Sequence, residues 1–193
     1  MTELILFHHA QGLTDGVRAF ADELRSAGHR VTVPDLYDGQ TFATLEAGVA
    51  HAQRIGFGTL IARGELAAAA LPTSIVYAGF SLGVLPAQKL AQTRSGALGA
   101  ILYHGAISIG EFAPTWPSGV GLQMHFSEAD PWSADDKEAA CHLAAAVDRC
   151  ELHLYAGSGH LIADRSLSEY DPKAAALILE RSLAFLERVS TYP

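Results

Sequence analysis

The chain reads SIVYAGFSLG at residues 74–83. Residues 74–78 form a short apolar run rich in β-branched side chains, which is typical of a buried strand, and the residues that follow favour a helix. Between them lies the pattern Gly-x-Ser-x-Gly, with Ser81 at its centre. A tight turn from strand to helix leaves little room for side chains, which explains the two glycines. The segment therefore predicts a strand–turn–helix unit that presents Ser81 as a nucleophile at a helix N-terminus, where backbone N–H groups favour developing negative charge.

The pattern alone is weakly specific, because a chain with this glycine and serine content would contain it by chance in roughly one case in ten. The strand before it and the helix after it strengthen the prediction. The competing interpretation is a glycine-rich turn in which Ser81 only caps the helix.

The rest of the chain alternates short apolar runs with longer amphipathic segments. Strands are predicted at residues 4–7, 30–33, 74–78, 98–103, 120–126 and 151–155. Helices are predicted at residues 14–28, 43–71 with a break near Gly56 and Gly58, 82–92, 134–147, and from Pro172 onward with Asp171 as the cap. This alternation predicts an α/β fold: one domain over residues 1–193 with a mostly parallel central sheet, helices on both faces and no cap domain.

Composition excludes several classes of protein. The 193 residues are 49% hydrophobic, which excludes disorder, and no apolar run is long enough to span a bilayer. The net charge of −8 and the lack of a basic stripe argue against nucleic acid as a partner. Two cysteines make no disulfide framework. No basic region precedes the first apolar run, so a cytoplasmic location is expected and no membrane partner is predicted. The oligomeric state is not indicated.

A serine nucleophile needs a base, and the base needs an orienting acid. In sheets of this kind the two follow the serine in the order acid, then histidine, in loops after later strands. Asp130 follows the strand at 120–126, and His160 follows the strand at 151–155. We therefore predict Ser81, Asp130 and His160 as catalytic residues, with Glu128 and Asp135 as alternative acids.

The developing oxyanion needs two donors. The backbone N–H of Leu82 is predicted as one, and that of Ala10, in the loop after the first strand, as the other, with Gln11 as its alternative. Side chains near strand ends are expected to bind the substrate, with ordinary packing as the alternative for the aromatic ones. These are His9, Gln11, Tyr37, Phe80, Trp132 and Arg165, together with Tyr103 and His104.

At residues 79–83, Asp130 and His160 the chain resembles the dienelactone hydrolase family of α/β-hydrolases, and the likeness extends over nearly the whole length. The resemblance implies a compact α/β-hydrolase fold that hydrolyses a small ester or lactone. Name-giving members use a cysteine nucleophile, a glutamate in the first loop and arginines that hold the substrate carboxylate. This chain has Ser81 and His9 at the first two positions, and Arg165 is the candidate for the third.

The predicted function is hydrolysis of a small carboxylic ester or lactone through an acyl-enzyme, with the ester or lactone as the partner molecule and no cofactor or metal. The alternative is a non-catalytic protein that binds small molecules on the same fold. A metal site at His8, His104 and His125 is disfavoured, because these residues lack the spacing of metal-binding motifs.

Overall fold

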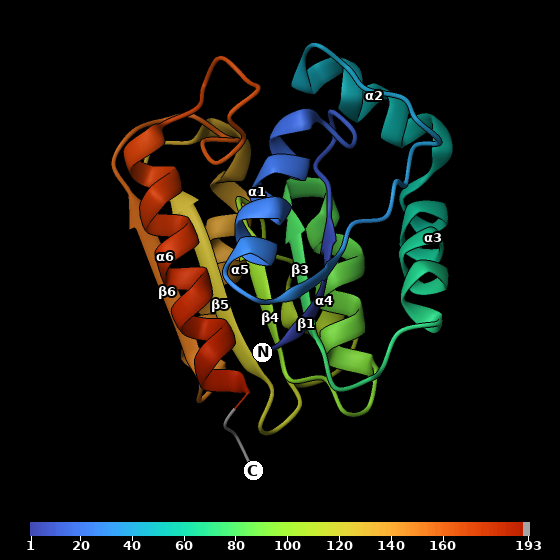
Figure 1. The fold of residues 1–193 in the computed structure, drawn as a ribbon, viewed down its shortest axis with the longest axis vertical. Helices are drawn as coiled ribbons and strands as arrows, with labels where there is room; N and C mark the ends of the chain where they lie inside the picture. The colour runs from blue at the N-terminus through green and yellow to red at the C-terminus, as the bar shows by residue number, and fades with distance from the viewer. Residues whose placement is uncertain (191–193) are drawn as a thin grey trace.

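Six parallel strands form one sheet in the computed structural model, which describes residues 1–190 (Figure 1). They are β1 (Glu3–Phe7), β2 (Arg30–Thr32), β3 (Val76–Phe80), β4 (Gly99–Tyr103), β5 (Gly121–Ser127) and β6 (Cys150–Tyr155). Their order across the sheet is β2-β1-β3-β4-β5-β6, and every neighbouring pair is parallel. All the predicted strands are confirmed, with small shifts at their ends.

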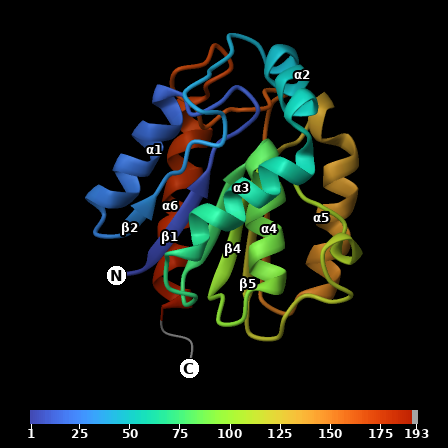
Figure 2. The ribbon, with the colours of Figure 1, turned by 90° about the vertical axis from the view of Figure 1, so that its right-hand side faces the viewer.

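Helices cover both faces of the sheet, as Figure 2 shows. They are α1 (Asp15–Ser26), α2 (Leu45–Ile55), α3 (Phe57–Ala69), α4 (Val84–Thr93), α5 (Ala134–Ala146) and α6 (Pro172–Val189). Alternate residues of β1 point to opposite faces. Leu4 and Leu6 belong to the core between the sheet and helices α1 and α6, whereas Ile5 and Phe7 belong to the core on the face covered by α3, α4 and α5. The predicted α/β architecture is confirmed, and residues 1–190 form no additional lid domain.

Polar caps define where the helices begin. The Thr14 side chain accepts a hydrogen bond from the Val17 N–H at the start of α1, and Asp171 caps α6 with Pro172 at its first position. The predicted break in the segment 43–71 lies at Gly56, whose φ of 90° separates α2 from α3. None of the helices in residues 1–190 combines the length and apolarity needed to cross a membrane.

The topology gathers the predicted site residues at one edge of the sheet. In parallel sheets, the loops after the strands all lie at the carboxyl edge. The first loop follows β1, Ser81 follows β3, Asp130 follows β5 and His160 follows β6. Segments far apart in the sequence are therefore brought to a common edge by strand order alone.

Candidate active site

Ser81 lies on a strained turn between β3 and α4. Its φ is 47°, a left-handed value that is costly for a residue with a side chain. A Cβ added to Gly79 would lie 2.2 Å from the Gly83 carbonyl oxygen, and one added to Gly83 would lie 2.5 Å from the Phe7 carbonyl oxygen. Both glycines are required by close backbone approach. The turn, a one-turn 3₁₀ helix named η1 (Ser81–Gly83), thus packs directly on the end of β1.

A chain of hydrogen bonds joins Ser81, His160 and Asp130. The Oγ atom of Ser81 lies 2.8 Å from His160 Nε2, and His160 Nδ1 lies 2.6 Å from Asp130 Oδ2. Burial opposes the charge on Asp130, but hydrogen bonds from His160 and Ser133 outweigh it and hold the pKa of this carboxyl below its usual range. An ionised Asp130 accepts a hydrogen bond from the Nδ1–H group, which leaves Nε2 free to accept the Ser81 hydroxyl proton.

The acid loop is held by groups that the sequence pattern did not indicate. The other oxygen of Asp130 accepts the Trp132 N–H at 2.9 Å, and Ser133 Oγ donates to Oδ2 at 2.6 Å. Lys137, on α5, donates to the Glu128 carbonyl oxygen at 2.8 Å. Of the three acids considered for this loop, Asp130 is the one in contact with His160. Glu128 and Asp135 are exposed at the surface.

The histidine loop is also braced. The backbone N–H of His160 donates to Glu169 Oε2 at 2.6 Å, and Ser127, at the end of β5, donates from its hydroxyl to the Gly159 carbonyl oxygen at 2.6 Å. These contacts fix the backbone on both sides of the imidazole. Neither partner follows from spacing, because each depends on how loops distant in sequence pack together.

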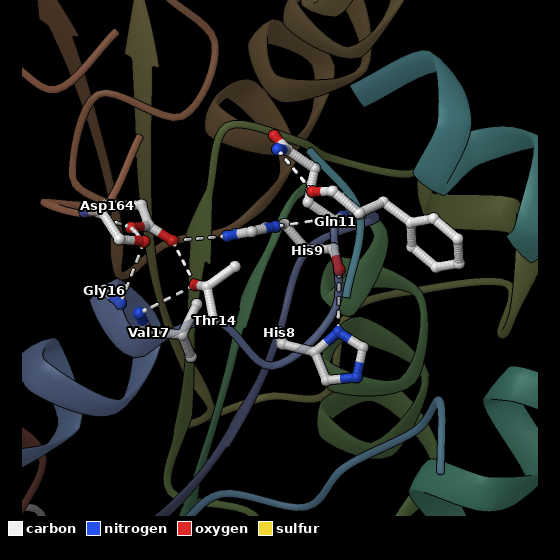
Figure 3. Close-up of polar contacts among 9 residues, drawn as sticks. His8, His9, Gln11, Thr14, Gly16, Val17 and Asp164 are labelled. Carbon is white, nitrogen blue, oxygen red and sulfur yellow. Dashed lines mark hydrogen bonds and ion pairs between the residues drawn. The ribbon is translucent and has the colours of Figure 1, made fainter. Parts of the chain in front are cut away.

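The first loop, which contains Ala10, is anchored through His9 (Figure 3). His9 Nδ1 accepts the Gln11 N–H at 3.2 Å, so the ring proton is on Nε2 and points at Asp164 Oδ2, 2.8 Å away. The N–H of Gln11 is therefore engaged within the loop. Ala10 is buried. A Cβ added to Gly48 of α2 would lie 2.1 Å from the Ala10 carbonyl oxygen, so α2 packs closely on this loop.

Asp164 is the centre of this polar cluster. Besides His9, its carboxylate accepts Thr14 Oγ1 at 2.5 Å, Ser166 Oγ at 2.6 Å and the Ser166 N–H at 2.8 Å. Burial opposes ionisation, but these donors outweigh it and lower the pKa of Asp164 to about 2. A Cβ on Gly16, in the first turn of α1, would lie 1.6 Å from Asp164 Oδ1. Because Gly16 has no side chain, the Asp164 carboxylate can lie against the N-terminus of α1, where negative charge is favourable.

A pocket of about 550 Å³ opens beside Ser81. Its wall comes from the start of α3, from Leu82 and Leu85, from the loop after β4 and from the start of α5. The lining residues are Phe57, Gly58, Ile61, Ser81, Leu82, Leu85, Ile107, Glu111, Phe112 and Asp136. The loop after β4 therefore contributes directly to the site through its first half. Trp116, in its second half, is buried instead and donates to the Val120 carbonyl oxygen.

A family model for the dienelactone hydrolase family matches residues 2–190. The chain belongs to the dienelactone hydrolase family. Membership supports a hydrolase that acts on a small molecule. No curated protein matches the sequence.

Solved structures of family-like proteins share the fold at low sequence identity. A dienelactone hydrolase-like promiscuous phosphotriesterase from metagenomic libraries is 18% identical, with a TM-score of 0.74 over 98% of this chain and 87% of that one. A dienelactone hydrolase from Anabaena variabilis is 19% identical, with a TM-score of 0.66 over 97% and 86%. An esterase of Thermogutta terrifontis, phosphonylated by cyclosarin, is 18% identical, with a TM-score of 0.69 over 99% and 84%.

The side chains predicted to bind the substrate differ from those that line the pocket. Six of the eight are buried in the structure: His9, Gln11, Tyr37, Phe80, Tyr103 and His104. Tyr37 packs edge-on against His8 and His51, and Phe80 stacks on Tyr103. A position beside a strand end does not determine which way a side chain points, and apolar rings at this edge turn into the core.

The other two predicted binding residues lie at the surface. Arg165 forms an exposed ion pair with Glu23 of α1, 3.3 Å away. Trp132 is 47% exposed, and its ring centre lies 6.4 Å from that of His160. Of the side chains predicted to contact the substrate, only that of Trp132 is both exposed and next to the catalytic candidates.

His104 follows β4 at the same sheet edge and has an unusual environment. It is fully buried with a φ of 59°, and neither ring nitrogen has a hydrogen-bond partner within residues 1–190. Its ring centre lies 6.1 Å from that of His160. Burial is the main cause, and the nearby His160 a further one, of a pKa lowered to about 3 at His104. Within the described chain, no group of three or more histidine, cysteine or acidic side chains is placed to hold a metal ion.

Proposed function

We propose that this protein hydrolyses a small carboxylic ester or lactone, with Ser81 as the nucleophile, His160 as the base and Asp130 as the orienting acid. The observation that supports this most strongly is the continuous hydrogen-bond chain from Ser81 Oγ through the imidazole to the Asp130 carboxylate. Membership of the dienelactone hydrolase family supports the reaction class. A pocket that opens directly beside the serine supports a small substrate.

In the proposed mechanism, His160 Nε2 takes the hydroxyl proton as Ser81 Oγ attacks the carbonyl carbon. Asp130 holds the imidazole in the required tautomer and stabilises its positive charge. His160 then protonates the leaving alcohol, and the acyl-enzyme remains. Water, activated by the same imidazole, attacks the acyl carbon, which releases the acid and returns the proton to Ser81.

The oxyanion is assigned to two backbone N–H groups, those of Leu82 and Ala10. Leu82 directly follows the serine at the start of a helical segment, where N–H groups have no intrahelical partner. For the second donor, the engaged N–H of Gln11 favours Ala10 over its neighbour. The two donors belong to backbone segments that pack directly on each other, because the turn at Gly83 contacts the end of β1.

Steady-state hydrolysis of a short-chain p-nitrophenyl ester tests this proposal. Ser81→Ala and His160→Ala should each lose at least about a thousandfold in kcat, since the residues act as a unit. The exposed residues Ser95 and His142 provide the matched variants Ser95→Ala and His142→Ala, which should retain full activity. A kcat in Ser81→Ala equal to that of the wild type would overturn the proposal. So would binding of ester without turnover, which is the outcome expected for a non-catalytic binding protein.

A further inference from the structure

We infer that the pocket beside Ser81 selects substrates whose bound portion bears no negative charge, and that Asp136 and Glu111 are the residues that exclude anions. The inference rests on the proposed function and extends it to the substrate class. Both carboxylates line the pocket, and the remaining wall is mostly aliphatic and aromatic. An uncharged, mainly apolar acyl group matches such a lining, whereas a carboxylate would be both repelled and desolvated there.

Asp136 lies close to the backbone of the proposed nucleophile. A Cβ added to Gly105 would lie 3.2 Å from Asp136 Oδ2 and 3.3 Å from the Ser81 carbonyl oxygen. The Asp136 carboxylate and the Ser81 backbone therefore lie on either side of the same small space next to Gly105. Asp136 is half-buried in the first turn of α5, whereas Glu111 is exposed at the outer rim. The electrostatic effect of Asp136 is therefore the stronger, because solvent screens exposed charges.

Lysine and arginine side chains of the surrounding helices do not offset these charges. The residues that line the pocket include no lysine, arginine or histidine within the described chain. The lysine and arginine residues on the helices that build the pocket are engaged elsewhere. Arg63 of α3 pairs with Asp38, and Lys89 of α4 pairs with Glu65. Lys137 of α5 donates to carbonyl oxygens of the acid loop.

The expected carboxylate-binding arginine is absent from this pocket as well. Arg165, the candidate from the sequence, is exposed and lies in an ion pair with Glu23 of α1. The charged groups that line the pocket are therefore both acidic, and the site repels the kind of substrate that an arginine would attract.

A matched pair of esters tests the inference directly. One is the mono-p-nitrophenyl ester of adipic acid, and the other is the neutral ester in which an isopropyl group replaces the carboxylate. The quantity measured is the ratio of kcat/KM for the neutral ester to that for the anionic ester, at about pH 7.5, where the substrate carboxylate is ionised. Because both values come from one enzyme sample, a partly unfolded variant gives the same ratio as a fully folded one.

Wild-type enzyme should prefer the neutral ester. Asp136→Asn should reduce the ratio by about tenfold and Glu111→Gln by about threefold, as expected for one charge at close range and one that is screened. Asp135→Asn is the matched control, since Asp135 is the exposed neighbour of Asp136 on α5 and does not line the pocket. Its ratio should stay within about twofold of wild type, as expected for an exposed charge.

The outcomes separate this inference from the function on which it rests. A wild-type preference for the anionic ester, or a ratio unchanged by both Asp136→Asn and Glu111→Gln, overturns the inference while the esterase assignment stands. An equal change in Asp135→Asn also overturns it, because a general charge effect would then explain the result. Failure of the wild type to hydrolyse either ester, or hydrolysis that persists in Ser81→Ala, overturns the proposed function and this inference together.

Discussion

His9 Nε2 lies 2.8 Å from Asp164 Oδ2, and this buried contact joins the loop that contains Ala10 to the loop that contains His160. Only three residues separate His160 from Asp164 in the sequence. The contact therefore fixes the proposed oxyanion loop relative to the proposed base. It uses a histidine whose other nitrogen already accepts a backbone N–H from its own loop.

Asp164→Asn should destabilise the fold strongly. The carboxylate accepts four hydrogen bonds, and an amide in its place presents an NH₂ group to donors. We expect the free energy of unfolding, measured by urea denaturation, to fall by about 2–4 kcal/mol. Asp22→Asn, which breaks the exposed pair between Asp22 and Arg25, should cost less than about 1 kcal/mol. Equal losses in the two variants would show that the buried hydrogen bonds of Asp164 stabilise the fold no more than an exposed ion pair does.

Buried histidines should make the fold sensitive to acid. Burial lowers the pKa of His8 to about 4 and that of His104 to about 3, from an ordinary value of 6.5. As pH falls through 6.5, the unfolded chain binds protons that the folded protein does not, so stability declines until the pH reaches the folded-state values. Each residue should contribute a slope of about 1.4 kcal/mol per pH unit near pH 5.

His104→Asn isolates one of these contributions. Asparagine tolerates the left-handed backbone at this position and does not titrate. Plotted as unfolding free energy against pH, the slope of the variant near pH 5 should be smaller than that of wild type by about 1.4 kcal/mol per unit. His142→Asn, at an exposed position, should leave the slope unchanged. If His104→Asn had the same slope of unfolding free energy against pH as the wild type, His104 would have to be charged in the folded protein.

The two glycines of the turn should not tolerate a methyl group. Gly79→Ala and Gly83→Ala each place a Cβ within 2.5 Å of a backbone oxygen, which cannot move without shifting a strand or helix. Each should lower the unfolding free energy by at least about 3 kcal/mol in thermal or urea denaturation. Gly110→Ala, where the added Cβ meets open space, should stay within about 0.5 kcal/mol of wild type. Wild-type stability in either turn variant would contradict the packing described for η1.

The discrimination of the pocket against anionic esters should weaken as the pH falls. The pKa of Asp136 is raised to about 6, mainly by burial and also by Asp135 and Asp130, against opposing effects of the Ala106 N–H and His160. As pH falls through 6, Asp136 becomes neutral, so the neutral-to-anionic ratio should fall between about pH 8 and pH 5.5, where the substrate stays ionised. A ratio in Asp136→Asn that falls as steeply as in wild type would contradict this assignment.

The sequence predicted the fold well because its signals are local. Apolar runs such as 4–7 and 98–103 mark strands, and caps such as Thr14 mark helix starts, with little help from tertiary contacts. Chain order and strand ends were also enough to nominate Ser81 and His160, which the structure brings within hydrogen-bond distance.

The pocket could not be predicted in the same way. Asp136 and Glu111 lie in a helix start and a loop whose path depends on packing, and no periodicity points to them. Tyr37 and His9 were expected at the substrate because they stand near strand ends. Their rings turn inward instead, since burial of an aromatic face and a satisfied hydrogen bond to Asp164 are more favourable than exposure.

Covalent labelling of Ser81 is the most direct test of the central claim. Wild-type protein would be treated with a dialkyl fluorophosphonate and examined by mass spectrometry of the intact chain and its peptides. We predict one adduct per chain, formed with loss of fluoride and located on Ser81, and a rate at least about a thousandfold lower in His160→Ala, because the serine is not nucleophilic without its base. No adduct on wild type, or an adduct on any other residue, would contradict the account.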